Sequence, residues 1–235
     1  MNKTLLIVAL MSLLPIHAQA KEGDIVVRLR GTHVSPSESS NLGSITDQSY
    51  GAGTAATVYG SAGAKLEVES NTIPEIDISY YFTKNIAAEL ILALGTRHNV
   101  AVSGSGGLLT QRGLGSVNLL PPTLTAQWHF NPDEMFDPYV GAGASYIRAL
   151  DNGATANTTV GNFPIKTSRN SFGPALQAGL DVNVKDGWLV NFDVKKIWFN
   201  KDIELNASVL AAGFKKVDEL GVHPWILSIG LGKNF

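Results

Sequence analysis

Charged side chains recur in segments that are otherwise apolar, several of them two residues apart. The set is Arg28, Arg30, Glu75, Asp77, Glu89, Arg97, Asp181, Asp193 and Lys195. Residues i and i+2 of an extended strand share one face, so these groups would meet if the strands enclosed an interior. Four positive and five negative groups confined there must pair, because an unpaired buried charge costs several kcal/mol. We predict that these groups form a polar plug across the interior. The plug either only stabilises the fold or also forces any transported molecule to leave by a route other than straight through the interior.

Histidines are the other residues that could bind a metal ion or serve as general bases. His33, His98 and His223 all fall in the outward phase at predicted strand ends, and none has a Ser or an acid at triad-like spacing. The chain has no cysteine, which excludes a disulfide framework and a thiolate metal site. We therefore predict no enzyme, no metal site and no cofactor.

The elements that would position these residues are strands, because eight segments alternate apolar and polar residues. In 74–82, Ile76 and Ile78 share one face while Glu75 and Asp77 share the other. The eight segments are 24–35, 74–82, 87–98, 122–130, 139–148, 174–184, 188–199 and 225–235. Strands of about ten residues, apolar outward and polar inward, are typical of outer-membrane barrels. We predict an all-β fold, an eight-stranded antiparallel transmembrane β-barrel.

The connections between these segments alternate in length. The short ones are 83–85, 131–137 and 185–187, and the long ones are 36–72, 98–118, 149–171 and 200–222. This alternation predicts short periplasmic turns and long extracellular loops. A soluble sandwich would not segregate its connections in this way. Within the last loop, 205–220 has the pattern of a short amphipathic helix.

The first twenty residues have the features of a secretory signal peptide. Lys3 precedes an apolar run from 5 to 14, and Ala18-Gln19-Ala20 is a small-x-small cleavage site. After residue 20 no apolar run approaches 18 residues, so we expect no membrane-spanning helix. We predict a signal peptide at 1–20 and one barrel domain at 21–235, located in the cell outer membrane. The formal net charge of −2 gives no reason to expect nucleic acid as a partner.

Aromatic residues lie where the strands would cross the membrane interfaces. Phe82, Phe130, Trp188 and Phe235 lie at predicted periplasmic ends, and Trp198 and Trp225 lie at the other ends. Trp188 and Trp198 are ten residues apart. At about 3.4 Å per residue and a tilt near 40°, this spacing covers roughly 26 Å of the membrane normal. That length agrees with the apolar band of a membrane barrel.

Four segments carry a family resemblance. They are Val27-Arg28-Leu29-Arg30-Gly31 leading to Val34-Ser35-Pro36, then Leu120-Pro121-Pro122-Thr123, then Pro138-Tyr139-Val140-Gly141-Ala142-Gly143, and Pro224-Trp225 leading to the terminal Phe235. With these segments the chain resembles the OmpW family of small outer-membrane channels over essentially the whole mature chain. The resemblance implies an eight-stranded barrel that helps small hydrophobic molecules cross the outer membrane, in a family that includes alkane-uptake proteins.

Apolar residues in the long loops could form an extracellular pocket for such molecules. They are Leu108, Leu109, Leu114, Leu205, Val209, Leu210 and Phe214. Exposed apolar clusters often mark binding sites, although long loops could equally pack on themselves. The alternative to a channel is a structural or adhesive surface protein with a plugged lumen. A porin for polar solutes is disfavoured, because eight strands enclose too narrow an interior.

Prolines begin the four strands expected to return toward the periplasm. They are Pro74, Pro121-Pro122, Pro174 and Pro224. Each proline removes a donor from the sheet ladder, and the ends of loops explain most of them. Pro121 and Pro122 remove two donors in a row, so we predict a lateral exit into the bilayer beside this pair.

Basic residues in the outward phase at the extracellular strand ends would meet the outer leaflet. They are His33, His98, Arg148, Lys196 and His223. Because Arg and Lys bind phosphate well, we expect outer-membrane lipid and lipopolysaccharide as partners. The contact is either a specific cationic rim or simple snorkelling into headgroups. A barrel of this kind also implies the outer-membrane assembly machinery as a partner.

Overall fold

The computed structural model describes residues 21–93, 96–104, 106–151, 153–207 and 213–235. The predicted signal peptide at 1–20 lies outside the described residues. Within them, no helix is long and apolar enough to cross a membrane.

Eight strands form a closed antiparallel barrel, as the alternating segments predict. In barrel order they are β1 (Ile25–Ser35), β4 (Asn71–Tyr81), β5 (Ile86–Ala93), β8 (Thr123–His129), β9 (Phe136–Ala149), β12 (Asn170–Asn183), β13 (Trp188–Ile197) and β16 (Trp225–Asn234). Pairing of β1 with β16, from Val26↔Asn234 to Ser35↔Trp225, closes the barrel. Closure removes the free sheet edges that lipid could not hydrogen-bond. The predicted fold class is confirmed.

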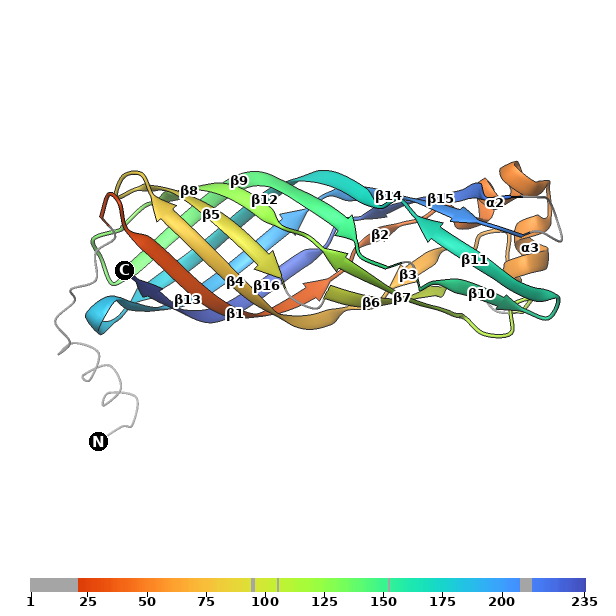
Figure 1. Ribbon diagram of the computed structural model, residues 1–235, viewed down its shortest axis with the longest axis horizontal. Helices are drawn as coiled ribbons and strands as arrows, with labels where there is room; N and C mark the ends of the chain where they lie inside the picture. Colours follow the sequence, from red (N-terminus) through yellow and green to blue (C-terminus); the bar gives the residue numbers. More distant parts are fainter. Residues whose placement is uncertain (1–20, 94–95, 105, 152, 208–212) are drawn as a thin grey trace, which may run out of the picture.

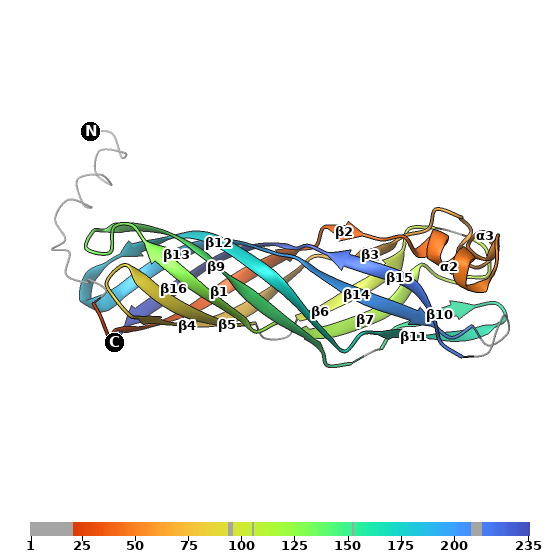
Figure 2. The same ribbon diagram turned by 90° about the horizontal axis from the view of Figure 1, so that it is seen from above.

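The two ends of the barrel differ. The short turns at 82–85, 130–135 and 184–187, the last containing the 3₁₀ turn η1 (Lys185–Gly187), lie at the end that also holds the C-terminus (Figure 1). The opposite end continues far beyond the barrel and finishes in two helices (Figures 1 and 2). This segregation is the predicted arrangement of periplasmic turns and extracellular connections.

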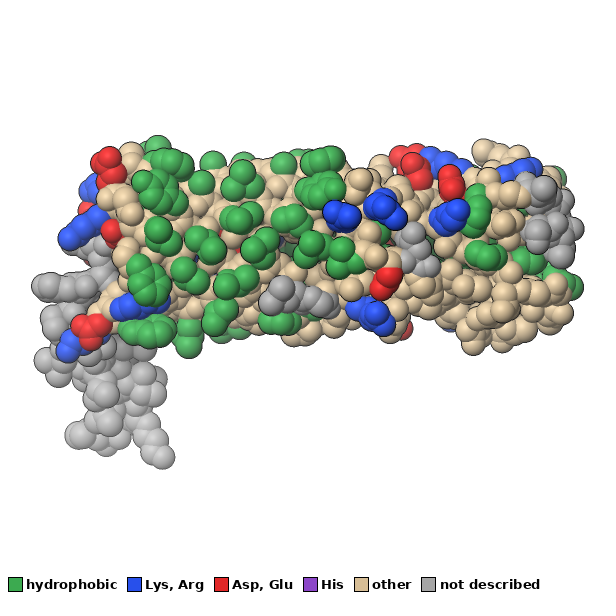
Figure 3. Space-filling view, in the orientation of Figure 1, with side chains coloured by type: hydrophobic (Ala, Val, Ile, Leu, Met, Phe, Trp, Pro, Cys, Tyr) green, Lys and Arg blue, Asp and Glu red, His purple; other side chains and the backbone are tan. Residues whose placement is uncertain are grey.

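The outer face of the barrel is an apolar belt. Leu29 is 65% exposed and Leu231 is 59% exposed, while the intervening positions face inward. Figure 3 shows apolar side chains covering the half of the molecule near the turns, with Lys and Arg side chains at the border toward the extracellular half. This surface suits a hydrocarbon environment, which explains why the strands alternate as they do.

The long extracellular connections consist largely of further strands. These are β2 (Glu38–Ser39), β3 (Leu66–Val68), β6 (Thr96–Val102), β7 (Gly113–Leu120), β10 (Thr155–Thr158), β11 (Gly161–Thr167), β14 (Phe199–Leu205) and β15 (Lys215–Val222). The sheet of the barrel thus extends outward through β6 and β7, and a second sheet has the order β10-β11-β14-β15-β2. The helix predicted at 205–220 is wrong for the ends of that range, because Leu205 belongs to β14 and 215–220 belong to β15, which pair as an antiparallel ladder. Residues 208–212 lie outside the described residues. Cross-strand pairing overrides the helical periodicity of this short segment.

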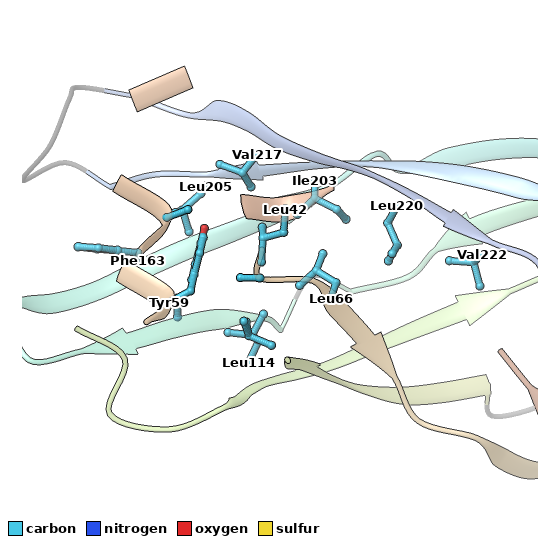
Figure 4. Packing of buried hydrophobic residues seen from close by; sticks show 14 of the residues in the cluster. Leu42, Tyr59, Leu66, Leu114, Phe163, Ile203, Leu205, Val217, Leu220 and Val222 are labelled. Atoms are coloured by element: carbon cyan, nitrogen blue, oxygen red, sulfur yellow. The ribbon is translucent and has the colours of Figure 1, made fainter. Parts of the chain in front are cut away.

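Two helices, α2 (Leu42–Tyr50) and α3 (Thr54–Tyr59), lie at the extracellular tip. Their buried residues join a hydrophobic cluster formed by the inward faces of the extracellular strands. In Figure 4, Leu42 and Tyr59 of the helices point toward Leu66 and Leu205 of the strands. The tip is therefore a packed core, and the functional site lies between this core and the barrel lumen.

Candidate functional site

The barrel lumen contains a network of buried ion pairs. Arg28 is fully buried, and its guanidinium contacts Asp181 Oδ2 at 2.6 Å and Glu89 Oε1 at 3.3 Å. It also donates to Ser79 Oγ at 2.6 Å. These partners come from β4, β5 and β12, so one side chain from β1 crosses the lumen and contacts three other strands.

Arg30 and Lys195 extend the network toward the extracellular side. Arg30 contacts Asp77 Oδ2 at 2.8 Å and Glu89 Oε1 at 3.1 Å. Lys195 Nζ lies 2.9 Å from Glu75 Oε1. It lies at the same distance from Asp193 Oδ1. The structure therefore brings together eight of the nine residues proposed for the plug.

Arg97 is the exception, and its placement in the lumen is corrected. Its side chain is 63% exposed and lies 3.5 Å from Asp151 on the outer surface. The reason is a change of phase between β5 and β6. Ala93 and Thr96 both face inward although they are three positions apart, so the residues beyond them have the opposite alternation. The same change turns His98 inward, where it is 7% exposed.

Uncharged polar residues complete the plug, and the charge pattern alone did not indicate them. Tyr139 donates to Asp193 Oδ2 at 2.7 Å, and Asn191 Nδ2 donates to Asp181 Oδ1 at 2.6 Å. Gln127 and Gln177 each donate to Glu89 Oε2 at 2.9 Å. All are inward-facing strand residues, so the alternation that selected the charged residues could also have selected these.

At the periplasmic end, the lumen is closed by buried aromatic and imidazole rings. His129 Nδ1 lies 2.7 Å from Asp137 Oδ2, and Tyr81 OH lies 3.1 Å from His129 Nε2. The Tyr139 ring stacks on His129 with centroids 5.0 Å apart. Above these rings, the charged side chains fill the middle of the barrel. The plug thus occupies the lumen from its periplasmic mouth to Glu75 and Lys195.

An apolar cavity of about 120 Å³ lies directly above the plug. Its floor includes Glu75 and Lys195, and its wall is mostly aliphatic and aromatic. Representative lining residues are Val34, Leu66, Ile91, Val117, Ile147 and Phe199. Its polar lining residues include Thr96, His98 and Lys201. Because its lining is almost entirely apolar, the cavity suits an apolar ligand.

Most of the loop residues proposed for the pocket lie elsewhere, and that proposal is corrected. Leu114 lines the cavity. Leu205 belongs to the packed core at the tip, with Leu108 and Leu109 against it. The Phe214 ring contacts Lys166, whose Nζ lies 3.7 Å from the ring centroid. Val209 and Leu210 lie outside the described residues. The pocket is instead lined mostly by strand residues, because the extracellular connections continue the sheet.

The barrel wall has an interrupted ladder next to this cavity. Among the described residues, β5 pairs with β8 as far as Ile91↔Thr123, and pairing resumes between β6 and β7 at Thr96↔Leu119. Pro121 and Pro122 lie at this interruption, and Pro121 lines the cavity. On the other side of these prolines, the Tyr146 N–H donates to the Pro122 carbonyl at 2.9 Å. Within the described residues, backbone pairing beside the two prolines is therefore interrupted on the side that faces β5, while a hydrogen bond to β9 remains on the other side.

The other prolines do not mark comparable breaks between a strand and its neighbours. Pro74 lies within β4, opposite Gly31 of β1, and Pro174 lies within β12, opposite Ala144 of β9. Pro224 separates β15 from β16. The expectation that all four positions begin strands is thus corrected for Pro74 and Pro174, where the strand continues through the proline.

Aromatic side chains lie at both borders of the apolar belt. Phe82, Phe130, Trp188 and Phe235 are exposed near the short turns, and Trp225 is exposed at the other border. Trp198 is half-buried in a shallow groove with Phe172 and His223. Such girdles are found at the interfaces of membrane barrels.

The histidines considered as metal ligands or bases have different surroundings: His33 is exposed, whereas His98 is buried and lines the cavity. His33 Nδ1 lies 3.0 Å from Thr72 Oγ1, whereas the His223 N–H donates to Ser37 O. Among the described residues, no group of three or more His, Asp or Glu side chains is arranged to hold a metal ion.

A closed eight-stranded barrel with an apolar belt, aromatic borders and a plugged lumen defines a small outer-membrane β-barrel protein. The model of the OmpW family matches residues 21–235, and the chain belongs to this family. The protein is accordingly located in the cell outer membrane, and its architecture is consistent with a small-molecule channel.

Relatives support this assignment along most of the chain. The uncharacterized outer-membrane protein y4mB of Sinorhizobium fredii is 38% identical over 196 residues, which cover 83% of this chain and 76% of that protein. Outer membrane protein W of Escherichia coli is 33% identical over 177 residues, covering 75% of this chain and 78% of that protein. The crystal structure of OprG from Pseudomonas aeruginosa is similar with a TM-score of 0.76 and 28% identity, covering 94% of this chain and 99% of that one. All three are named as outer-membrane proteins.

Proposed function

We propose that the protein passes small hydrophobic molecules across the outer membrane by way of the apolar cavity and releases them sideways into the bilayer. The observation that carries this proposal is the position of the cavity. It lies directly above a filled polar lumen, and its wall includes Pro121 at the interrupted ladder. A purely structural or adhesive surface protein would need the plug but not this cavity.

The energetics favour the sideways route. A hydrophobic molecule that moved straight down would have to displace the contacts of Arg30 and Lys195 with their carboxylates, and each buried charge left unpaired costs several kcal/mol. A molecule that leaves beside Pro121 and Pro122 crosses the wall where the described residues of β5 and β8 have no pairing beyond Ile91↔Thr123. It then enters hydrocarbon without crossing water.

A double substitution that supplies the missing donors tests the exit. We expect Pro121→Val with Pro122→Thr to leave the protein folded and membrane-inserted, and to lower uptake of a hydrophobic compound such as an alkane in a deletion strain. Pro138→Val is the matched control, because Pro138 lies in β9 near the periplasmic end and does not line the cavity. Unchanged uptake in the double variant, or an equal loss in the control, would refute a lateral exit at this position.

The same uptake assay tests the route through the lumen. Replacement of Glu75 and Arg30 by Gln removes two of the charges that close the top of the plug. If passage is lateral, these changes leave uptake unchanged in protein that still inserts. Increased uptake would favour a path through the lumen instead.

A further inference from the structure

Lys201 is a buried cation in the wall of the cavity. It lies on β14, three residues beyond Trp198 and therefore on the extracellular side of the aromatic border. The residue is 4% exposed and lines the cavity. Its Nζ donates to two backbone carbonyls, Ser168 O at 3.0 Å and Ile147 O at 3.3 Å.

Lys201 differs from the other lysine of the cavity in its partners. Lys195 has two carboxylates at 2.9 Å. Among the ion pairs of the described residues, none includes Lys201. The carboxylates beside it on β14 point outward, and Asp202 pairs there with Lys216 at 2.6 Å.

Acidic groups on the neighbouring elements are also engaged elsewhere. Asp218 of β15 is buried and accepts from Ser40 Oγ at 2.5 Å and from Asn41 N at 2.9 Å. Glu219 of β15 is exposed and lies 3.0 Å from Lys216. Glu75, in the floor of the cavity, belongs to the plug through Lys195. The remaining titratable group that lines the cavity is His98, whose Nδ1 lies 3.0 Å from Glu69 O.

Burial of an ammonium group among apolar side chains and carbonyl oxygens disfavours its charge. Desolvation lowers the pKa of Lys201 to about 8. The group therefore stays mostly protonated at neutral pH, where it lacks the anionic partner that would offset its desolvation. Two carbonyl acceptors satisfy two of its three N–H donors, so one donor remains for a ligand.

We propose that Lys201 recognises the head group of the ligand, and that the cavity takes single-chain carboxylates whose alkyl chain lies against its apolar wall. The carboxylate accepts a charge-assisted hydrogen bond from Nζ, while the chain contacts residues such as Ile165, Phe199 and Ile203. This inference rests on the proposed function, because it requires the cavity to bind a hydrophobic molecule, and it names the chemical class that binds best.

Equilibrium binding to the full-length mature protein tests the assignment. The protein is placed in zwitterionic phosphatidylcholine nanodiscs, with empty nanodiscs as the blank, and decanoate is compared with decan-1-ol. We expect Lys201→Met to weaken decanoate binding about tenfold at pH 7 and to leave decan-1-ol binding within about twofold. Lys201→Gln keeps an N–H donor for the two carbonyls without the charge, and we expect the same loss of decanoate affinity.

The wild-type protein provides a test that needs no variant. Its affinity for decanoate should fall between pH 7 and pH 9.5 as Lys201 loses its proton, whereas its affinity for decan-1-ol should not. Full decanoate affinity in Lys201→Gln, an equal loss for both ligands in Lys201→Met, or a flat wild-type pH profile would overturn the role of Lys201. Failure of the wild-type protein to bind either compound would instead overturn the proposed function itself.

Discussion

Glu89 is the residue at which the plug is most sensitive to a single change. Its fully buried carboxylate accepts hydrogen bonds from Arg28, Arg30, Gln127 and Gln177. The substitution Glu89→Gln keeps the size of the side chain but removes the charge and places an amide N–H₂ where only acceptors fit. Loss of one partner from a buried ion pair costs about 3–5 kcal/mol. Because the two arginines keep other carboxylates, we expect destabilisation of about 3 kcal/mol, at the low end of that range.

Urea unfolding in lipid vesicles measures this loss. Tryptophan fluorescence reports the transfer of the barrel wall from lipid to water on unfolding, because Trp128, Trp188 and Trp225 are exposed on the belt. Asp133→Asn is the matched control: Asp133 lies 2.8 Å from Lys84, but both side chains are about half-exposed, and such pairs contribute about 1 kcal/mol or less. If Glu89→Gln unfolds within about 1 kcal/mol of the wild type, the plug does not hold the barrel together as described.

Two other predictions concern the outer surface. Replacing Arg148 and Lys196 with Ala should lower the thermal stability of the protein more in membranes containing lipopolysaccharide than in neutral detergent. Both residues lie at the outer border of the belt, and Lys196 Nζ also lies over the Trp225 ring, 4.7 Å from its centroid. Equal losses of stability in the two media would argue for simple snorkelling. Deletion of Phe235 should slow membrane insertion, because it removes an aromatic side chain that is 73% exposed at the periplasmic border. Heat-modifiable mobility on gels measures the inserted fraction, and insertion at the wild-type rate would contradict this prediction.

Strand alternation was enough to predict the barrel and most of the plug. Arg28 and Arg30 follow the phase of a regular strand, so their inward direction could be inferred from the sequence. Arg97 could not be placed correctly, because the change of phase between β5 and β6 depends on tertiary pairing rather than on local pattern. A change of phase within a strand pair cannot be recognised by counting alternating apolar and polar residues in the sequence.

The extracellular half was harder to predict for a different reason. Gly-, Ser- and Asn-rich connections are typical of loops. The contacts that make β14 and β15 a ladder join residues from ten positions apart, Leu205 and Lys215, to 23 positions apart, Phe199 and Val222. The sequence pattern does not single out Lys201, because 200–222 has the composition of a loop, where a lysine is normally solvated. Once 199–205 is known to be a strand, alternation with Phe199 and Ile203 places Lys201 on the inner face.

The filled lumen also bears on the barrier function of the membrane itself. An outer membrane protects the cell only while ions and polar toxins cannot diffuse through its proteins. The side chains around Glu89 and Arg28 fill the middle of the barrel, so an ion that enters the lumen meets buried ion pairs instead of an open passage. A barrel filled in this way spans the membrane without adding a wide aqueous pore to it.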